Sequence, residues 1–279
     1  MTHHDPDRRR FVSGAVLAAG YALATRPAAA GAIATDAKGL HAGTVMIPTT
    51  TGEMPGYAAM PAGKGPHPAV LVVQEIFGVH EYIRDICRRL AKLGYLAVAP
   101  ELYFRQGDPS TIPDIPTLLS TLVSKVPDAQ VLADLDASAR WAEANGADPA
   151  RMGITGYCWG GRIAWLYAAH NPRLKAAVAW YGRLVGEATP NTPRHPIDVA
   201  AGLSVPVLGL YGGADTGIPL DTVERMKQGL KAGTSGSDIV VYPDAPHAFH
   251  ADYRPSYREA PAKDGWVRLQ SWFASHGLV

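Results

Sequence analysis

Apolar residues follow two patterns that alternate along most of the chain. Short continuous apolar runs, typical of strands buried on both faces of a sheet, occupy 69–74, 95–99, 152–155, 174–180, 205–211 and 238–242. Stretches with helical spacing of apolar residues occupy 83–93, 131–145, 163–169, 220–232 and 265–276. A short hairpin is predicted before them, from His41 to Ile47 and from Tyr57 to Met60. This alternation predicts an α/β fold with a mainly parallel sheet and helices on both faces.

Two long segments interrupt the alternation of strands and helices. Residues 101–128 and 184–202 are rich in proline and lack a clear period, so we predict irregular chain there. Each follows a predicted strand, and the carboxyl ends of strands are where α/β sheets bind ligands. The sequence contains no internal repeat, and a single domain is expected over residues 35–279.

The first 34 residues have the composition of an export signal. Arg8, Arg9 and Arg10 precede Phe-Val, a mild apolar run and then small residues at A-x-A spacing. This order resembles a twin-arginine signal, from which it departs at Asp7 and Ser13. The apolar run is shorter than the roughly 20 residues of a membrane span. A Sec signal or an uncleaved anchor are the alternatives.

The leader predicts a protein that the export machinery delivers to the periplasm or the exterior. Cleavage after Ala30 or after Ala34 fits the spacing of the small residues. No stable membrane span is expected once the leader has been removed.

Composition narrows the class of protein. The chain has 279 residues, 47% of them hydrophobic and 18% charged, so a large core is expected. A formal net charge of +1 gives no basic excess for nucleic acid. Two cysteines, Cys87 and Cys158, are too few for a disulfide framework or a cysteine-based zinc site, and no metal or cofactor is expected. Cys87 is predicted in the core, and a disulfide between the two would block Cys158.

Candidate chemistry centres on Gly156-Tyr157-Cys158-Trp159-Gly160-Gly161. Gly-x-Cys-x-Gly between a predicted strand and a predicted helix has the form of a nucleophile elbow, with cysteine in place of serine. The tight turn requires glycine at its flanks and leaves the side chain of its central residue exposed for reaction. The alternative is an ordinary buried cysteine in a glycine-rich loop.

A cysteine nucleophile needs a base and an acid, and the chain supplies both after later strands. Asp215 follows the predicted strand at 205–211, and His247 follows the strand at 238–242. The order Cys158, Asp215, His247 is that of the α/β-hydrolases, in which the carboxylate orients the imidazole. Asp215 as a turn residue and His247 as a surface histidine are the alternatives.

From about Thr44 onward the sequence resembles the dienelactone hydrolases, also called carboxymethylenebutenolidases. The segments that carry the resemblance are 74–79 (QEIFGV), 100–106 (PELYFRQ), 156–161 (GYCWGG), 212–215 (GGAD) and 247–249 (HAF). The resemblance implies an α/β-hydrolase fold and metal-free hydrolysis of the lactone ring of dienelactone to maleylacetate. It also implies a small-molecule lactone or ester as the substrate.

The resemblance assigns further roles around the nucleophile. It implies that Glu75 activates the thiol when substrate binds, and that the backbone N–H groups of Ile76 and Trp159 form the oxyanion hole. A carboxylate at a buried strand end is poorly solvated and can accept a proton. The alternative for Glu75 is a structural ion pair with Arg84 or Arg162.

Substrate binding is where this sequence departs from the resemblance. Arg105 matches an arginine that binds the substrate carboxylate, and Tyr103 lines the same site or packs as an aromatic. A second arginine, four residues after the histidine in the type enzyme, is replaced by Ala251, with Arg254 nearby. The native substrate is therefore open between a dienelactone-like lactone and other esters or thioesters. A non-catalytic binding protein on the same fold is a third hypothesis.

Overall fold

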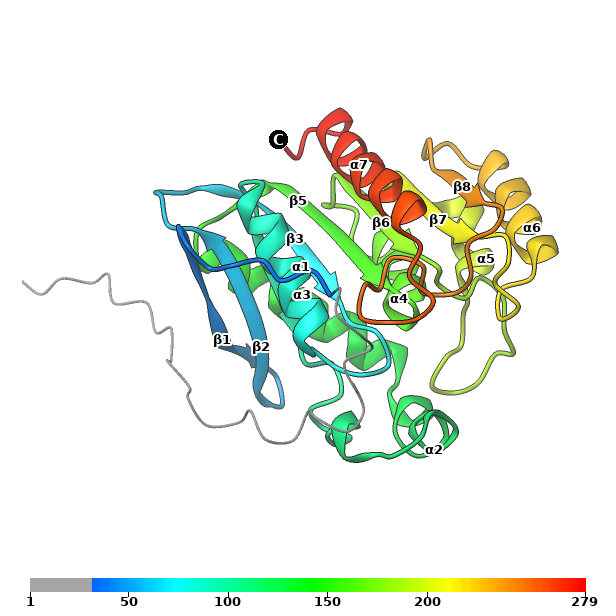
Figure 1. Ribbon diagram of the computed structural model, residues 1–279, viewed down its shortest axis with the longest axis horizontal. Coiled ribbons are helices and arrows are strands. Elements are labelled where there is room, and N and C mark those ends of the chain that lie inside the picture. Colours follow the sequence, from blue (N-terminus) through cyan, green and yellow to red (C-terminus); the bar gives the residue numbers. More distant parts are fainter. Residues whose placement is uncertain (1–31) are drawn as a thin grey trace, which may run out of the picture.

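One eight-stranded sheet organises the chain from Ala32 to Val279, the part that the computed structural model describes (Figure 1). The predicted leader therefore lies almost wholly outside the described residues. The strand order is β1-β2-β4-β3-β5-β6-β7-β8. The strands are β1 (Leu40–Thr49), β2 (Gly52–Pro61), β3 (His67–Val73), β4 (Leu96–Pro100), β5 (Ala147–Tyr157), β6 (Ala176–Trp180), β7 (Val207–Gly212) and β8 (Asp238–Tyr242).

The first two strands form the predicted hairpin and run against the rest of the sheet. β1 pairs with β2 and β2 with β4 in antiparallel register, whereas every pair from β4 through β8 is parallel. Residues 69–73 and 96–100 are buried throughout, as their continuous apolar runs predict. The mainly parallel α/β sheet is thereby confirmed.

Helices cover both faces of this sheet. α1 (Glu81–Lys92) and α7 (Glu259–Ser275) lie in front of the strands in Figure 1, and α3 (Asp128–Ala144) and α4 (Trp159–His170) lie behind them. α6 (Leu220–Lys231) lies beside the edge strand β8. All parallel strands point their carboxyl ends to one edge of the sheet, so the turns that follow β3, β5, β7 and β8 meet there.

The irregular segments contain more structure than the sequence predicts. Residues 101–128 include α2 (Ile115–Thr121) and two 3₁₀ turns, and residues 184–202 include α5 (Pro196–Val199) and a third. α2 is capped by Asp114, whose Oδ1 accepts a hydrogen bond from the Thr117 amide at 2.8 Å. α7 begins at Glu259 rather than Gly265, because Pro261 stands in its first turn, where no N–H is needed.

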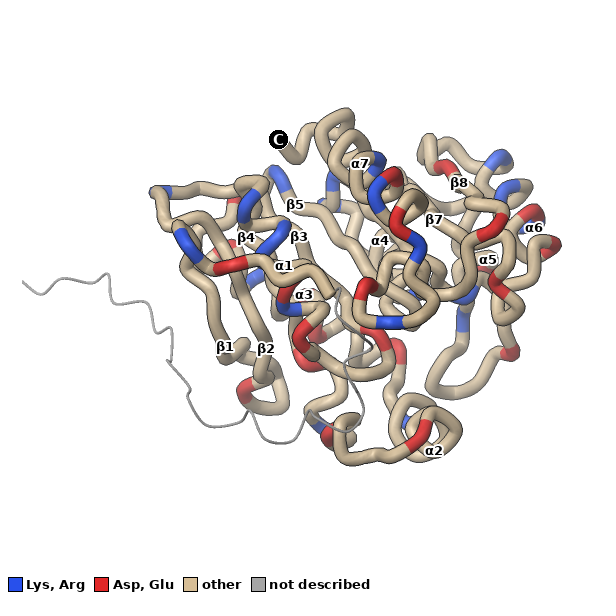
Figure 2. Tube along the Cα trace, in the orientation of Figure 1, with Lys and Arg blue, Asp and Glu red and all other residues tan. Residues whose placement is uncertain are grey.

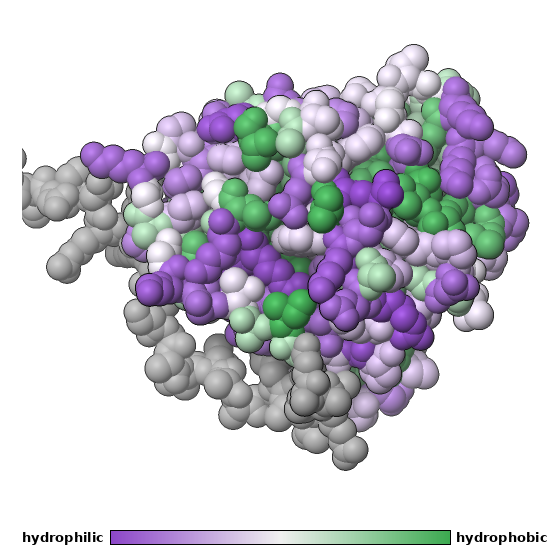
Figure 3. All heavy atoms as spheres, turned by 45° about the horizontal axis from the view of Figure 1, so that its top comes forward, coloured by the Kyte–Doolittle hydropathy of each residue, from purple (hydrophilic) through white to green (hydrophobic). Residues whose placement is uncertain are grey.

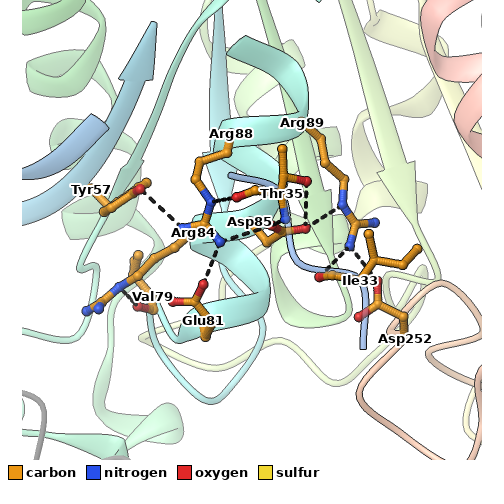
Figure 4. Close-up of polar contacts among 10 residues, drawn as sticks. All are labelled: Ile33, Thr35, Tyr57, Val79, Glu81, Arg84, Asp85, Arg88, Arg89 and Asp252. Carbon is orange, nitrogen blue, oxygen red and sulfur yellow. Dashed lines mark hydrogen bonds and ion pairs between the residues drawn. The ribbon is translucent and has the colours of Figure 1, made fainter. Parts of the chain in front are cut away.

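The segment that precedes β1 is bound to α1 by a network of polar contacts (Figure 4). Asp85 accepts a hydrogen bond from the Thr35 amide at 2.6 Å, and Arg88 Nε donates to the Thr35 carbonyl at 2.7 Å. Arg89 joins Asp85 on α1 to Asp252 in the loop after β8. The start of the folded domain is thus connected through α1 to the loop that carries the candidate histidine.

Charged residues of both signs are mixed along the surface elements. Figure 2 shows basic and acidic residues side by side on α1, α6 and α7, which agrees with the small net charge. Figure 3 shows a largely hydrophilic face with apolar residues in separate groups. Within residues 32–279, no helix has the length and apolar character needed to cross a membrane.

Candidate active site

Cys158 lies in a strained turn between β5 and α4. Its φ of 57° and ψ of −115° are unusual for a residue with a side chain. A Cβ on Gly156 would lie 2.0 Å from the Gly160 carbonyl oxygen, and a Cβ on Gly160 would lie 2.5 Å from the Gln74 carbonyl oxygen. Only glycine fits at either position, so the motif forms the tight turn that its spacing predicts.

The structure brings the three predicted triad residues into one chain of hydrogen bonds. Cys158 Sγ lies 3.1 Å from His247 Nε2, and His247 Nδ1 lies 2.7 Å from Asp215 Oδ2. Since an ionised carboxylate only accepts hydrogen bonds, the proton lies on Nδ1 and Nε2 faces the sulfur. The other oxygen of Asp215 accepts from the Gly217 amide at 2.8 Å, which fixes the buried carboxylate.

The turns after β7 and β8 hold the acid and the base together. The Gly213 amide donates to the Tyr242 carbonyl at 2.7 Å, and the Ala214 amide donates to the Ala245 carbonyl at 3.1 Å. These bonds bring Asp215 and His247 together, although 32 positions separate them in the sequence. The order of residues in the sequence predicts the contact between Asp215 and His247 because the turns after β7 and β8 lie at the same end of the parallel strands.

The environment of His247 favours its protonated form. Burial lowers the pKa of His247, but hydrogen bonds with Asp215 and Cys158 outweigh burial and raise the pKa to about 10. The imidazole is therefore a strong acceptor for the proton of the thiol. The second nearby histidine, His250, is buried on a hydrogen bond with Tyr82 at 2.7 Å, and burial holds its pKa well below the usual value.

Glu75 lies in the turn after β3 and is fully buried. Its Oε2 accepts hydrogen bonds from the Tyr253 hydroxyl at 2.7 Å and from His80 Nε2 at 3.2 Å. Of the two arginines considered as its partners, Arg162 pairs with Asp128 and Arg84 donates to the Val79 carbonyl.

The titration of Glu75 is set by competition between burial and its neighbours. Burial raises the pKa of Glu75, but the hydrogen bonds from His80 and Tyr253, with the charge of Arg254, bring the pKa below its usual value. In this state the carboxylate is held as an anion on two donors. His247 is the group that contacts the sulfur and can take its proton.

The proposed oxyanion-hole residues lie in two turns that approach each other at the elbow. Trp159 is the first residue of α4, whose leading N–H groups have no acceptor within the helix. Ile76 follows Glu75 in the turn after β3, and the close approach of Gly160 to the end of β3 brings this turn against the elbow. Tyr103 is buried with its ring 5.0 Å from the Trp159 ring, which agrees with packing beside the site.

Arg105 is paired with a carboxylate of the protein itself, and its role in substrate binding stays a prediction. Its guanidinium forms two hydrogen bonds to the buried Asp134 carboxylate on α3, at 2.6 and 2.9 Å. It also donates to Thr51 in the turn between β1 and β2 at 2.7 Å. These bonds engage much of the guanidinium fork with a carboxylate of the protein itself.

Arg254 lies in the loop after β8, near Glu75. Its guanidinium carbon lies 5.5 Å from the centre of the Phe77 ring, and its charge acts on both Glu75 and Tyr253. Ala251, at the position of the second arginine of the resemblance, is fully buried. The structure therefore places a cation near Glu75, although not at the position that the resemblance suggests.

Sequence reasoning missed His80 and Tyr253 as neighbours of Glu75. Tyr253 lies six residues after His247 in the loop that joins β8 to α7, where no motif marks it. His80 directly precedes α1, five residues after Glu75, and this short spacing was the available signal. Tyr181, with a φ of 40°, also packs its ring 5.2 Å from the His247 ring.

Both cysteines are free, and Cys87 is buried in α1. Burial raises the pKa of the Cys87 thiol well above its usual value, so it stays protonated. Among the residues from 32 to 279, no group of three or more His, Cys, Asp or Glu side chains is placed to hold a metal ion.

A parallel α/β sheet with a strained nucleophile turn, and with an acid and a histidine after later strands, defines an α/β-hydrolase. The model of the dienelactone hydrolase family matches residues 54–277. The chain belongs to this family and is a carboxylic-ester hydrolase.

Individual relatives agree with this assignment. A protein of Methylorubrum extorquens named "Putative carboxymethylenebutenolidase" is 63% identical over 97% of this chain and 94% of its own length. A Salmonella typhimurium protein of the same name is 62% identical over 92% of this chain and 96% of its own. The crystal structure of a "Putative Dienelactone Hydrolase" from Klebsiella pneumoniae has a TM-score of 0.83 at 64% identity, covering 84% of this chain and 98% of that one.

Proposed function

We propose that this hydrolase cleaves lactones or esters through a covalent intermediate on Cys158. The observation that carries the proposal is the hydrogen-bonded chain from Cys158 through His247 to Asp215. His247 takes the thiol proton, the sulfur attacks the carbonyl carbon, and the N–H groups of Ile76 and Trp159 stabilise the oxyanion. The leaving oxygen takes the proton from His247, and water then releases the acid from the thioester.

The proposed substrate is a dienelactone-like lactone that carries a carboxylate, held by the cation of Arg254. A general thiol esterase or thioesterase is the second candidate, and one observation favours it. Arg105 is already bound by Asp134, so the site has fewer cations for a charged substrate than the resemblance implies. An intact chain of nucleophile, base and acid counts against a binding protein without turnover.

Substitution of the nucleophile tests the reaction. Cys158→Ala is expected to abolish turnover of dienelactone and of 4-nitrophenyl acetate, and wild type mixed with a slow ester is expected to gain the mass of one acyl group. Turnover by Cys158→Ala would disprove the mechanism. Binding of lactone by wild type without turnover would instead support the binding protein.

Two arginine substitutions separate the substrate candidates. Arg254→Gln is expected to lower kcat/KM much more for esters with a carboxylate near the carbonyl than for neutral aryl esters. Arg105→Gln is the matched control, because it removes a cation that Asp134 already binds. Equal losses on charged and neutral esters for Arg254→Gln would favour the general esterase.

We also propose that residues 1–34 direct export to the periplasm or exterior. Residues 33–36 contact α1 and the loop after β8, and cleavage after Ala34 would remove the carbonyl of Ile33 from Arg89. Cleavage after Ala30 keeps these contacts and is the preferred site. Mass spectrometry of the mature N-terminus in a periplasmic fraction tests this, and an intact Met1 on all soluble protein would contradict export.

A further inference from the structure

The Glu75 carboxylate is buried, and its two oxygens differ in their hydrogen bonds. Oε2 takes two hydrogen bonds, from Tyr253 and His80, whereas Oε1 has no hydrogen-bond partner among residues 32–279. A buried polar atom without a partner is costly and uncommon in folded proteins. Two donors on one oxygen and none on the other therefore form an arrangement that calls for a physical explanation.

Glu75 and Cys158 both act electrostatically on Tyr253 and Tyr181, which places Glu75 and its donors in the neighbourhood of the nucleophile. The charge of Cys158 acts on Tyr253, the residue whose hydroxyl contacts Glu75. The turn that carries Glu75 meets the first turn of α4, where Gly160 approaches the Gln74 carbonyl. The unpaired oxygen therefore lies in the buried layer next to the turn that carries the partly buried thiol.

We propose that Tyr253 and His80 are positioning residues that hold Glu75 as an anion with Oε1 free to accept a hydrogen bond at the nucleophile. This inference rests on the proposed hydrolase function, which it extends by two residues. The ionisation state of Glu75 determines whether its carboxyl group can donate a hydrogen bond to the site. An ionised carboxylate only accepts hydrogen bonds, whereas a protonated one also donates. Without its two donors, a carboxyl in this apolar region would take up a proton.

The phenols that surround Glu75 do not change charge near neutral pH. Burial raises the pKa of Tyr82, Tyr157 and Tyr181, so these phenols stay protonated. Burial and the charge of Glu75 likewise raise the pKa of Tyr253, which therefore remains a donor. The titratable or charged groups that face Glu75 are His80 and Tyr82 at the start of α1, Tyr157 on β5, Tyr181 after β6, and Tyr253 and Arg254 after β8.

The loop that carries Tyr253 is fixed from its other side. Asp252, its neighbour in the sequence, forms an ion pair with Arg89, which also binds Asp85 on α1. His80 directly precedes the same helix. Both donors to Glu75 are thus placed by α1 and its contacts, which suits a fixed hydrogen-bond geometry better than a mobile one.

The test compares Tyr253→Phe with Tyr82→Phe across a pH series. Both changes remove one buried hydroxyl from the same aromatic cluster, in which the two rings lie 5.3 Å apart. Only Tyr253 bonds Glu75, whereas Tyr82 bonds His250. The readouts are kcat/KM for 4-nitrophenyl acetate and the rate of alkylation of Cys158 by iodoacetamide. Cys87 does not interfere, because it is buried and protonated.

Loss of a hydrogen bond to a charged group is expected to move the Glu75 ionisation upward by about one to two pH units. The shift should appear in Tyr253→Phe and be absent from Tyr82→Phe. His80→Gln, which keeps a donor, should shift less than His80→Ala. In a Glu75→Gln background, Tyr253→Phe should produce no further shift.

Three results would overturn the inference: an unchanged profile in Tyr253→Phe, an equal shift in Tyr82→Phe, or a shift that persists in Glu75→Gln. Thermal unfolding of each variant distinguishes a pH effect from a folding defect, since a purely structural role changes Tm without moving the ionisation. If wild type fails to turn over esters, the proposed function fails, and the alkylation profile still tests the roles of Tyr253 and His80.

Discussion

Breaking the buried ion pair between α3 and α4, formed by Asp128 and Arg162, at one partner is predicted to reduce the stability of the fold strongly. Arg162 Nη1 and Nη2 each lie 2.7 Å from an oxygen of Asp128, and the side chains are 5% and 9% exposed. Nη2 also donates to the Arg194 carbonyl at 2.7 Å. Arg162, four residues after Cys158, therefore joins the two long irregular segments, 101–128 and 184–202. We expect Asp128→Asn to leave the guanidinium buried without a counter-charge.

Removing one partner of a buried, hydrogen-bonded pair costs about 3 to 5 kcal/mol. Asparagine keeps one acceptor, and Arg194 keeps its bond, so we expect the lower end, about 3 kcal/mol. In a chain of this size that loss lowers Tm by roughly 6 to 12 °C. Urea unfolding followed by tryptophan fluorescence and thermal unfolding by circular dichroism measure the two quantities.

The control is Asp148→Asn, which breaks a pair with Arg151 whose side chains are 23% and 33% exposed. That change is expected to cost far less, because solvent screens the pair. The double variant Asp128→Leu with Arg162→Met removes both charges and should recover much of the lost stability. A loss in Asp128→Asn no larger than in the control would refute the reasoning, because the buried charge would then carry no penalty.

Three further predictions concern the triad, the elbow and the N-terminal segment. The pKa of His247 is raised from 6.5 to about 10, so its contribution to stability is complete below pH 6.5 and is lost as pH rises through about 10. Asp215→Asn should reduce the fall in the free energy of unfolding between pH 6.5 and 10, measured with urea, and should slow alkylation of Cys158 at pH 7. An unchanged fall in the free energy of unfolding would contradict this prediction. Gly160→Ala should prevent soluble folding or cost more than about 3 kcal/mol, because its Cβ meets backbone 2.5 Å away. Removing residues 1–36 should lower Tm by several degrees, because buried Asp85 loses the Thr35 amide, whereas a protein starting at Gly31 should match full length.

The sequence predicts the sheet well because local signals and global packing agree there. Strand β8 begins and ends where its apolar run does, at Asp238 and Tyr242, and the glycines around Cys158 are required by backbone contacts. The order of Cys158, Asp215 and His247 gives their proximity because the parallel strands end at one edge. α2 was missed because its two turns carry no continuous apolar stripe; only Leu118 among its residues is buried.

Side-chain partnerships were harder to predict than positions, for a physical reason that Arg105 illustrates. Nothing near Arg105 in the sequence indicates Asp134, which lies 29 positions away on another element. A guanidinium binds the carboxylate that the fold brings to it, and tertiary packing alone decides which one that is. Tyr253 was missed for the same reason, since its partner Glu75 lies 178 positions earlier.

These two misses together change the picture of the site. The cation expected from the segment after β4 is bound by the buried Asp134 of α3, and the charge beside Glu75 comes from Arg254 in the loop after β8. The same loop supplies His247, Tyr253 and Arg254, and Arg89 fixes it to α1 through Asp252. One loop therefore carries the proposed base for the thiol, a hydrogen-bond donor to Glu75 and the cation near the Glu75 carboxylate. Substrate preference in this protein should then respond to substitutions within residues 247–254 far more than to substitutions at Arg105.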